Sequence, residues 1–490
     1  PLLPPPPPPL PPPTPMASPP PPEPPLFSYL RSHEVGSSLS LLSPFGLRPI
    51  LYADHTASGR SLAFLESFLL EKVLPNYGNT HTSSSKTGKQ SSDFVSEART
   101  LAKVYTRCSK RDRMLFVGSG ATAAANALVA MLGLRPRTPR EREREREALG
   151  EAGRPVVFVG PYEHHSNLLP WRDSIADVVH IGEAREGSGP DMEELERELK
   201  KYAHRPLRVG AFSAVSNVTG LITDADAVCR LCHKHGALAV WDYASAAPHT
   251  LPDMNPPAAS AEDAAAIAKD AAFWSMHKLA GGPQAPGVLA FKADAILGPK
   301  AERRSSTVTP GGGTVFYVTE SEHIYLHDDE ERLEGGTPAI VGAIRAGLVL
   351  QLQHSVGAAA IHAADERIVS TLFERWRTVP NLLILGGTRR PRVPTFAFAV
   401  AVPWATARTG AVGGRLLLHH NYVVALLNDL FGIQVSSWPR RASAGPPQAV
   451  CPPTHALPSR RHAAAACALV PTRSRSSAST RPLPTPSCAS

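Results

Sequence analysis

Short apolar runs alternate with amphipathic segments through the middle of the chain. Five runs have the length and composition of buried strands: residues 113–117, 155–159, 207–213, 237–242 and 271–274. Helical patterns lie between some of them, over residues 121–132, 191–202 and 225–234. Strands that alternate with helices predict an α/β fold with a mostly parallel central sheet and helices on both faces. Because ligands of such sheets bind beyond the carboxyl ends of the strands, the residues there are the candidates for function.

Proline and net charge are concentrated at the two ends of the chain. Residues 1–25 hold 17 of the 50 prolines, which predicts a disordered polyproline segment. The formal net charge is +8, but residues 435–490 contain seven arginines and no lysine or acidic residue, so the rest of the chain is nearly neutral. We therefore expect a disordered Arg/Pro/Ala/Ser tail there, and a nucleic-acid partner is not favoured. A run of alternating charges at about 139–150 has no apolar face and predicts a solvated insertion.

Several other classes of protein are not favoured. No stretch approaches the ~18 consecutive apolar residues of a membrane span, so no membrane partner is expected. The chain starts Pro-Leu-Leu-Pro, without an initiator Met or the layout of a secretory signal. This start predicts a fragment of an intracellular protein, with the cytoplasm expected and an organelle left open.

Two cysteines and a histidine match a short cofactor string. Cys229-Arg-Leu-Cys232-His233 has the spacing of a haem c attachment site, but the same spacing suits two small residues on the buried face of a helix. We favour the core interpretation, since haem attachment needs an oxidising compartment. The spacing of His, Cys, Asp and Glu along the chain predicts no metal site.

Two polar clusters follow the first two predicted strands. Residues 118–122 (Gly-Ser-Gly-Ala-Thr) open a helix and could hold a phosphate, although small residues at such a turn are also common packing devices. His164 and His165 follow the second strand. Neighbouring residues point apart, so a stacking or proton-transferring imidazole is favoured over a metal ligand, with a structural polar loop as the alternative.

An acid and an amine follow two later strands. Asp242 closes a buried run, where its charge needs a cationic partner. Lys278 comes just after the next run, where burial would lower the pKa of its amine, as Schiff-base chemistry requires. A Schiff-base lysine together with an Asp on the ring nitrogen is the arrangement that pyridoxal 5′-phosphate requires.

An ordered set of motifs resembles the class V aminotransferases, a family that includes cysteine desulfurases and kynureninases. The motifs are residues 52–57, 118–126, 163–167, 216–220, 242–245 and 275–278, and the resemblance covers about residues 51–434. It implies the type I fold of pyridoxal-phosphate-dependent transferases. Residues 26–300 would form an N-terminal segment and a large cofactor-binding domain, and residues 301–434 a smaller, incomplete α+β domain.

The same resemblance implies roles for individual residues. Lys278 would form the aldimine and move the α-proton, Asp242 would keep the pyridine nitrogen protonated, and His164 would stack on the ring. The other residues implied to hold the cofactor are Ala121, Thr122, Asn217, Ser245, Ser275, His277 and Thr337. Thr337 matches a residue that reaches the phosphate of the partner subunit, so a homodimer is expected. Asn79 and His81 match a substrate-side loop.

Two departures limit what the resemblance implies. Ser245 stands where cysteine desulfurases carry Gln, and the match ends at Gln434, before the family's reactive-cysteine loop and carboxylate-binding Arg. The sequence therefore predicts a pyridoxal-phosphate-dependent enzyme acting on an amino acid, either an aminotransferase or cysteine desulfurase-like. The alternative is a catalytically inactive scaffold or interaction protein that lacks the C-terminal catalytic segment.

Overall fold

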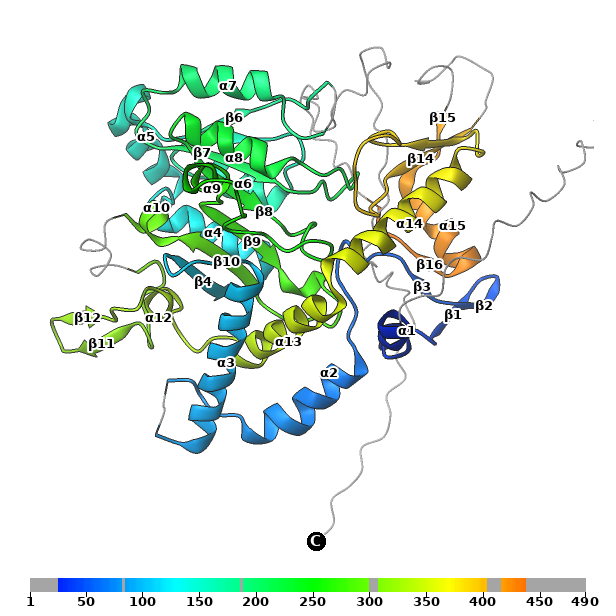
Figure 1. Cartoon of the computed structure of the whole chain (residues 1–490), viewed down its shortest axis with the longest axis horizontal. Helices are drawn as coiled ribbons and strands as arrows, with labels where there is room; N and C mark the ends of the chain where they lie inside the picture. The colour runs from blue at the N-terminus through cyan, green and yellow to red at the C-terminus, as the bar shows by residue number, and fades with distance from the viewer. Residues whose placement is uncertain (1–24, 82–83, 186–187, 299–306, 403–415, 438–490) are drawn as a thin grey trace, which may run out of the picture.

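The computed structural model describes residues 25–81, 84–185, 188–298, 307–402 and 416–437 (Figure 1). The predicted polyproline segment and most of the predicted Arg/Pro/Ala/Ser tail lie outside these ranges. Among the residues within them, no helix combines the length and the apolar character needed to cross a bilayer.

A seven-stranded sheet forms the centre of the large domain, in the order β4-β10-β9-β8-β7-β5-β6. Its strands are β4 (Asp112–Val117), β5 (Val156–Val159), β6 (Asp177–His180), β7 (Arg208–Ser213), β8 (Leu238–Asp242), β9 (Ala271–Ser275) and β10 (Gly287–Lys292). Strands β5 to β9 run parallel, whereas β10 is antiparallel to both of its neighbours. The five predicted strands are thus confirmed. Strands β6 and β10 were not predicted from the sequence. Strand β6 has only two apolar residues, and β10 follows a Gly/Pro-rich stretch typical of a loop.

Two apolar cores lie on opposite faces of this sheet. Side chains alternate in direction along a strand, so Trp241 packs into one core and Val240 into the other. The first face is covered by α3 (Lys86–Tyr105), α7 (Met192–Lys201), α8 (Ala225–Lys234) and α13 (Ile340–Val356), and the second by α4 (Gly120–Met131) and α6 (His165–Arg172). The predicted helices are confirmed as α4, α7 and α8. Cys229 and Cys232 are buried in the first core, which confirms the core interpretation of that pair.

The insertion with alternating charges is a helix, α5 (Pro139–Gly153). None of its residues is buried, as expected for a solvated segment. The Thr138 hydroxyl caps its first turn by accepting a hydrogen bond from the backbone N–H of Glu141 (3.1 Å). Arg146 joins the helix to the start of β6 through an ion pair with Asp177 (2.8 Å).

The remaining elements bring the two ends of the described chain together. The C-terminal part consists of α14 (Ala358–Trp376), β13 (Leu382–Ile384), β14 (Phe398–Val402), β15 (Leu416–Leu417), α15 (His420–Phe431) and β16 (Ile433–Gln434). The N-terminal part consists of α1 (Pro25–Ser32), β1 (Ser40–Ser43), β2 (Gly46–Pro49), β3 (Leu51–Tyr52) and α2 (Ala63–Phe68). Strand β16 pairs in parallel with β3, so the C-terminal chain is tied to the segment that leads into the large domain. The other described elements are α9 (Ala261–Ile267), α10 (Ala293–Leu297), β11 (Val315–Val318), β12 (His323–Tyr325) and α12 (Asp329–Leu333).

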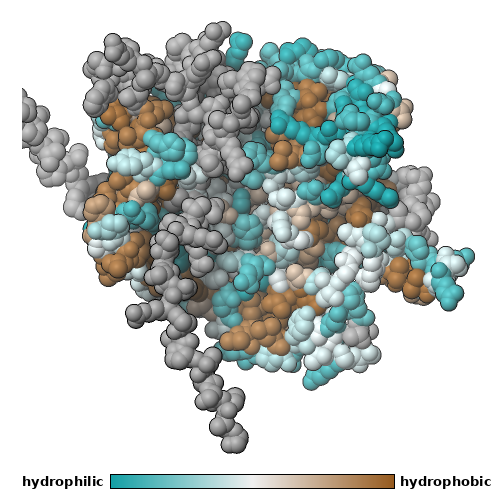
Figure 2. All heavy atoms as spheres, turned by 180° about the vertical axis from the view of Figure 1, so that it is seen from behind, coloured by the Kyte–Doolittle hydropathy of each residue, from teal (hydrophilic) through white to brown (hydrophobic). Residues whose placement is uncertain are grey.

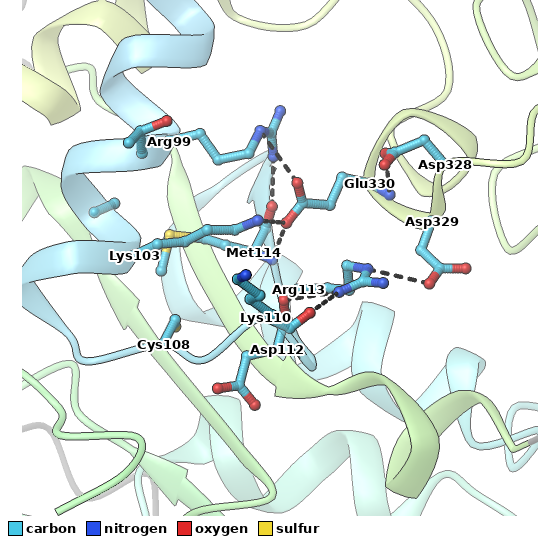
Figure 3. Close-up of polar contacts among 12 residues, drawn as sticks. Arg99, Lys103, Cys108, Lys110, Asp112, Arg113, Met114, Asp328, Asp329 and Glu330 are labelled. Atoms are coloured by element: carbon cyan, nitrogen blue, oxygen red, sulfur yellow. Dashed lines mark hydrogen bonds and ion pairs between the residues drawn. The ribbon is translucent and has the colours of Figure 1, made fainter.

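A short acidic helix protects the edge of the sheet. Strand β4 is an edge strand, and α12 lies beside it (Figure 3). Glu330 Oε1 accepts a hydrogen bond from the backbone N–H of Met114, and Glu334 Oε1 accepts one from that of Phe116, both at 2.6 Å. Four ion pairs complete the contact: Arg99–Glu334 (2.7 Å), Arg99–Glu330 (3.9 Å), Lys103–Glu330 (2.6 Å) and Arg113–Asp329 (3.1 Å). We call these six charged residues the acidic clamp. They satisfy N–H groups that an edge strand would otherwise leave open to other chains.

Candidate active site

Lys278 is the amine at the centre of the candidate site. It ends the short 3-10 helix Met276–Lys278, which directly follows β9. The side chain is half-buried, and within the described part of the chain its Nζ makes no hydrogen bond or ion pair. Burial lowers the pKa of the amine, and the carboxylates of Asp242 and Asp54 oppose that shift. A partly desolvated amine without a partner is suited to react as a nucleophile and base.

Asp242 ends the neighbouring strand β8. It is 5% exposed, and its Oδ1 accepts a hydrogen bond from the backbone N–H of Ala244 (2.7 Å). Burial raises the pKa of Asp242 to about 6, while the Ala244 N–H and the nearby Lys278 lower it. A carboxylate in this position would be stabilised by a cationic group of a ligand.

His164 stands at the start of α6, beyond the end of β5. Its Nδ1 accepts a hydrogen bond from the backbone N–H of Ser166 (3.1 Å), so it caps the helix. Burial lowers the pKa of His164 to about 4, and Lys278 adds to this effect. The ring is therefore uncharged at neutral pH and can pack against an aromatic ligand.

The N-terminus of α4 forms a small polar cradle beside these residues. Gly120 has a φ of 59°, and a Cβ added there would lie 2.7 Å from Ser275 Oγ, so the position requires glycine. Ser275 Oγ accepts a hydrogen bond from the backbone N–H of Ala121 (2.8 Å). Thr122 Oγ1 is 2.7 Å from Ser166 Oγ, which links the cradle to His164. The N–H groups at a helix start and the positive end of the helix dipole favour an anion such as a phosphate, although here the Ala121 N–H already donates to Ser275 Oγ.

His277, Asn217 and Ser245 line the same edge of the sheet. The ring of His277 comes within 3.6 Å of the Cβ position at Gly120, and burial lowers the pKa of the ring. Asn217 and Ser245 lie on the turns that follow β7 and β8. Both are half-buried, and within the described residues neither side chain makes a hydrogen bond.

Asn79, His81 and Thr337 form a second group. Asn79 Nδ2 donates to Thr337 Oγ1 (3.1 Å), and Asn79 Oδ1 accepts from the backbone N–H of His81 (2.9 Å). All three residues are exposed. Among the described residues, no hydrogen bond or ion pair connects this group to Lys278 or Asp242. The described contacts thus connect Ala121, Thr122, Ser275, His164 and His277 with one another, and they connect Asn79, His81 and Thr337 only among themselves.

Two carboxylates at the site are absent from the residues predicted to act there. Glu163 precedes His164 and accepts hydrogen bonds from Ser213 N (3.0 Å), Ser213 Oγ (2.7 Å) and Asn167 Nδ2 (2.5 Å). Burial raises the pKa of Glu163 to about 7. Asp54 influences the pKa of Lys278. Both lie within motifs that carry the family resemblance, but their charge and burial depend on contacts that the sequence does not reveal.

The arrangement fits a phosphorylated aldehyde on a nitrogen heterocycle. The cradle can bind the phosphate, the unpartnered amine of Lys278 can react with the aldehyde, and Asp242 can hold a proton on a ring nitrogen. These are the properties of pyridoxal 5′-phosphate. We call Lys278, Asp242, His164, Ala121 and Ser275 the lysine site.

Comparison with known proteins gives one family and one fold. The model of the family described as aminotransferase class-V matches residues 52–408. A probable cysteine desulfurase of Halalkalibacterium halodurans is 25% identical over 359 residues, which cover 71% of this chain and 77% of the relative. A cysteine desulfurase of Klebsiella pneumoniae is 24% identical over 393 residues, or 79% of this chain and 83% of the relative.

Solved structures show the same architecture. The apo structure of a cysteine desulfurase from Thermococcus onnurineus NA1 superposes with a TM-score of 0.60 at 21% identity, covering 79% of this chain and 84% of that one. The cysteine desulfurase CsdA from Escherichia coli gives a TM-score of 0.58 at 19% identity, with the same coverage. These neighbours confirm the predicted type I fold.

Proposed function

The chain belongs to the aminotransferase class-V family, and on this premise we propose that the lysine site binds pyridoxal 5′-phosphate and acts on an amino acid. The observation that carries the proposal is the partly buried amine of Lys278, which has no partner in the described chain and lies near the buried carboxylate of Asp242. Burying two such groups is costly unless a ligand compensates for it. The cofactor would supply that compensation.

Each residue of the lysine site would have its own role in binding the cofactor or in moving protons. When bound, pyridoxal phosphate supplies an electron sink that makes the α-hydrogen of an amino acid acidic. Asp242 would hold a proton on the ring nitrogen, and Lys278 Nζ would take the α-proton from the amino acid and return it. Ala121, Thr122, Ser275 and His277 would hold the phosphate. The uncharged ring of His164 would pack on the cofactor face and exclude water from it.

Amino-group transfer is the reaction that the described residues support best. A desulfurase-type reaction, in which the sulfur of the substrate is transferred to an enzyme thiol as a persulfide, would need a reactive cysteine, and the cysteines in the described ranges are Cys108, Cys229 and Cys232. Burial raises the pKa of Cys108 and of Cys229 to about 12 and also raises that of Cys232, so none is an activated thiol. Cysteine desulfurase-like chemistry remains the second candidate because the relatives cited above bear that name.

A homodimer is part of the proposal. The hairpin β11–β12 projects from the large domain and exposes Phe316 (76%) and Val318 (68%), and apolar surface is visible on it from behind (Figures 1 and 2). An open groove lined by Leu74, Tyr77 and Pro338 adjoins Thr337. The exposed group of Asn79, His81 and Thr337 lies next to this groove and lacks a polar connection to Lys278. A second copy of the chain would cover these surfaces and bring Thr337 to the partner's site.

An absorption spectrum tests cofactor binding. The full chain is incubated with pyridoxal phosphate, and unbound cofactor is removed. The absorption spectrum should then show a band near the edge of the visible range, and this band should be lost in Lys278→Ala. Lys292→Ala is the matched control, since Lys292 is a half-buried lysine of the same domain bonded to Asn255 (2.9 Å). A colourless wild-type protein would contradict the proposal.

Amino-acid titration of that band then separates the functions. L-alanine should change the band and yield pyruvate if the protein transfers amino groups. If it is desulfurase-like, L-cysteine should instead yield alanine, together with sulfide when a thiol reductant is added to reduce the sulfur that is released. A stable band that no amino acid perturbs would indicate the inactive scaffold instead.

A further inference from the structure

Asp54 is a buried carboxylate with an unsatisfied oxygen. It lies just after β3 and is 5% exposed. Its Oδ2 accepts a hydrogen bond from the hydroxyl of Ser436 (2.6 Å), whereas its buried Oδ1 has no hydrogen-bond partner among the described residues. Leaving a buried charged acceptor unpaired is costly, so the site favours a donor that would satisfy it.

The loop that carries Asp54 is packed directly onto the segment that carries Lys278. Gly59 N donates to the backbone oxygen of His277 (2.9 Å), and Ser58 Oγ donates to the same oxygen (3.2 Å). A Cβ added at Gly59 would lie 2.1 Å from the carbonyl oxygen of Leu279, so the two backbones are in close contact on both sides of Lys278. Tyr52 shapes the loop by donating to the backbone oxygen of Ser58 (2.9 Å).

The C-terminal chain holds Asp54 from the other side. Strand β16 pairs with β3 two residues before Asp54, and Ser436 is 3% exposed where it meets the carboxylate. Oδ2 is thus fixed by the protein, which leaves Oδ1 as the atom available to a ligand or to Lys278.

A donor of the right kind is close. Lys278 and Asp54 are near enough for each to shift the pKa of the other, and Asp242 is the other carboxylate that does so to Lys278. Asp242 is accounted for by the proposed ring nitrogen. The donor must carry a charge opposite to that of the Asp54 carboxylate and must be small enough to enter this loop. In an amino-acid site, primary ammonium groups meet both conditions.

We propose that Asp54 is a second carboxylate of the lysine site and that its Oδ1 accepts a hydrogen bond from a primary ammonium group, either that of Lys278 or that of the incoming amino acid. The alternative in which the incoming amino acid supplies the ammonium group rests on the proposed function. The alternative in which Lys278 supplies it does not, because it involves only residues of the protein.

The electrostatic surroundings fix the sign of the expected effect. Burial lowers the pKa of Lys278, and the carboxylates of Asp242 and Asp54 raise it. Burial and the charge of Lys278 together lower the pKa of His164 and that of His277. Burial raises the pKa of Asp54, whereas the hydrogen bond from Ser436 and the charge of Lys278 lower it. The pKa of Tyr52 is raised by burial and, to a smaller extent, by Asp54. An anionic Asp54 favours the charged form of Lys278, so removing its charge should lower the pKa of Lys278.

The test measures the pH dependence of Lys278 acetylation in the full chain without cofactor, read by peptide mass spectrometry. In Asp54→Asn, which keeps an oxygen for Ser436 but loses the charge, the midpoint should fall by about one pH unit. Labelling below that midpoint should become about tenfold faster. Ser436→Ala keeps the charge and should leave the midpoint near the wild-type value. Asp253→Asn, which removes a half-buried carboxylate elsewhere in the large domain, should also leave it unchanged. Asp54→Ser repeats the loss of charge with a smaller side chain, in case the Asn variant does not fold.

A second measurement identifies the source of the ammonium. If the amino acid supplies it, Asp54→Asn should raise KM for the amino acid by about tenfold with little change in kcat. A shift of the acetylation midpoint with an unchanged KM assigns Lys278, and a raised KM assigns the substrate whether or not the midpoint shifts, because the charge of Asp54 acts on Lys278 in either case. If neither changes in a variant that still shows the cofactor band, the proposal is wrong. A wild-type protein without that band would instead contradict the proposed function.

Discussion

The lysine site and the acidic clamp are both clusters of charged side chains withdrawn from water, and they differ in how those charges are satisfied. In the clamp, Arg99 forms two hydrogen bonds with Glu334 (2.8 and 2.7 Å). Lys103 and Arg113 each have a carboxylate partner as well, Glu330 and Asp329 (Figure 3). In the lysine site, Lys278 has no such bond within the described residues, and one oxygen of neighbouring Asp54 is unpaired. A saturated cluster stabilises a fold, whereas an unsaturated one is suited to receive a ligand.

The pKa values follow the same division. Arg99 is desolvated, which lowers the pKa, but the hydrogen bonds and charge of Glu334 outweigh this and raise it, so the clamp keeps its charges. In the lysine site burial prevails, and it shifts the pKa of Lys278, Asp242 and His164 toward their uncharged forms. Variants in the two clusters should therefore affect different properties of the protein.

Removing the lysine should have the largest effect on activity and almost none on stability. We expect Lys278→Ala to reduce kcat by about 10³-fold or more, because the group that moves the α-proton is lost. The free energy of unfolding should change by less than about 1 kcal/mol, since Lys278 forms no hydrogen bond or ion pair with any residue that the structure describes. Steady-state kinetics and urea denaturation of the same preparation measure both. A large loss of stability would place Lys278 with the structural charges.

Breaking the acidic clamp should have the opposite result. Glu334→Ala removes the two short hydrogen bonds of the partly buried Arg99, whose other carboxylate partner, Glu330, lies at 3.9 Å, and it leaves the Phe116 N–H unsatisfied. We therefore expect a loss of about 3–5 kcal/mol in the free energy of unfolding. Glu331→Ala on the same helix is the matched control, because Glu331 is exposed and should cost less than about 0.5 kcal/mol. Equal losses in the two variants would show that α12 does not stabilise the edge of β4.

Neutralising Asp242 should reduce activity without unfolding the protein. In Asp242→Asn the ring nitrogen loses the charge that would hold its proton, and we expect kcat to fall by about 10²-fold. The amide can still accept the hydrogen bond from Ala244 N, so thermal stability should stay close to that of wild type. Unchanged kinetics would exclude Asp242 from the proposed role.

The smallest expected effect is the change with pH in the free energy of unfolding that comes from the lysine site. The folded-state pKa of Asp242 is about 6, above its ordinary value of 3.8, so between these values the folded protein binds more protons than the unfolded chain. The contribution of this group to stability without cofactor is therefore fully present below about pH 4 and is lost as the pH rises through 6, by on the order of 1–3 kcal/mol. Urea denaturation at several pH values should show a smaller decline in Asp242→Asn than in wild type. Parallel curves would mean that burial does not raise the pKa of this carboxyl group.

The strand ends of the large domain were the part of the site most accessible from sequence. Asp242 and Lys278 follow apolar runs, and the structure places them on adjacent parallel strands, as the alternation of strands and helices predicts. The glycine-rich start of α4 was recognisable for the same reason. The antiparallel β10 was not, because its pairing with β4 and β9 depends on contacts across the sheet.

Features that join distant segments could not be predicted. Ser436 meets Asp54 from 382 residues away, and α12 meets β4 across more than 200 residues. The run of acidic residues at 328–331 is indistinguishable in sequence from a solvated surface. Thr337, Asn79 and His81 were identified by family resemblance, yet the hydrogen bond between Asn79 and Thr337 emerges only in the folded chain.

Borohydride reduction of the full chain incubated with pyridoxal phosphate, followed by peptide mapping, tests the central claim most directly. Reduction would fix the cofactor to whichever amine holds it. We predict a pyridoxyl group on the peptide that contains Lys278, in an amount close to one per chain, and none above background on the peptide that contains Lys292. Labelling spread over exposed lysines, or absent from Lys278, would contradict the assignment of the lysine site.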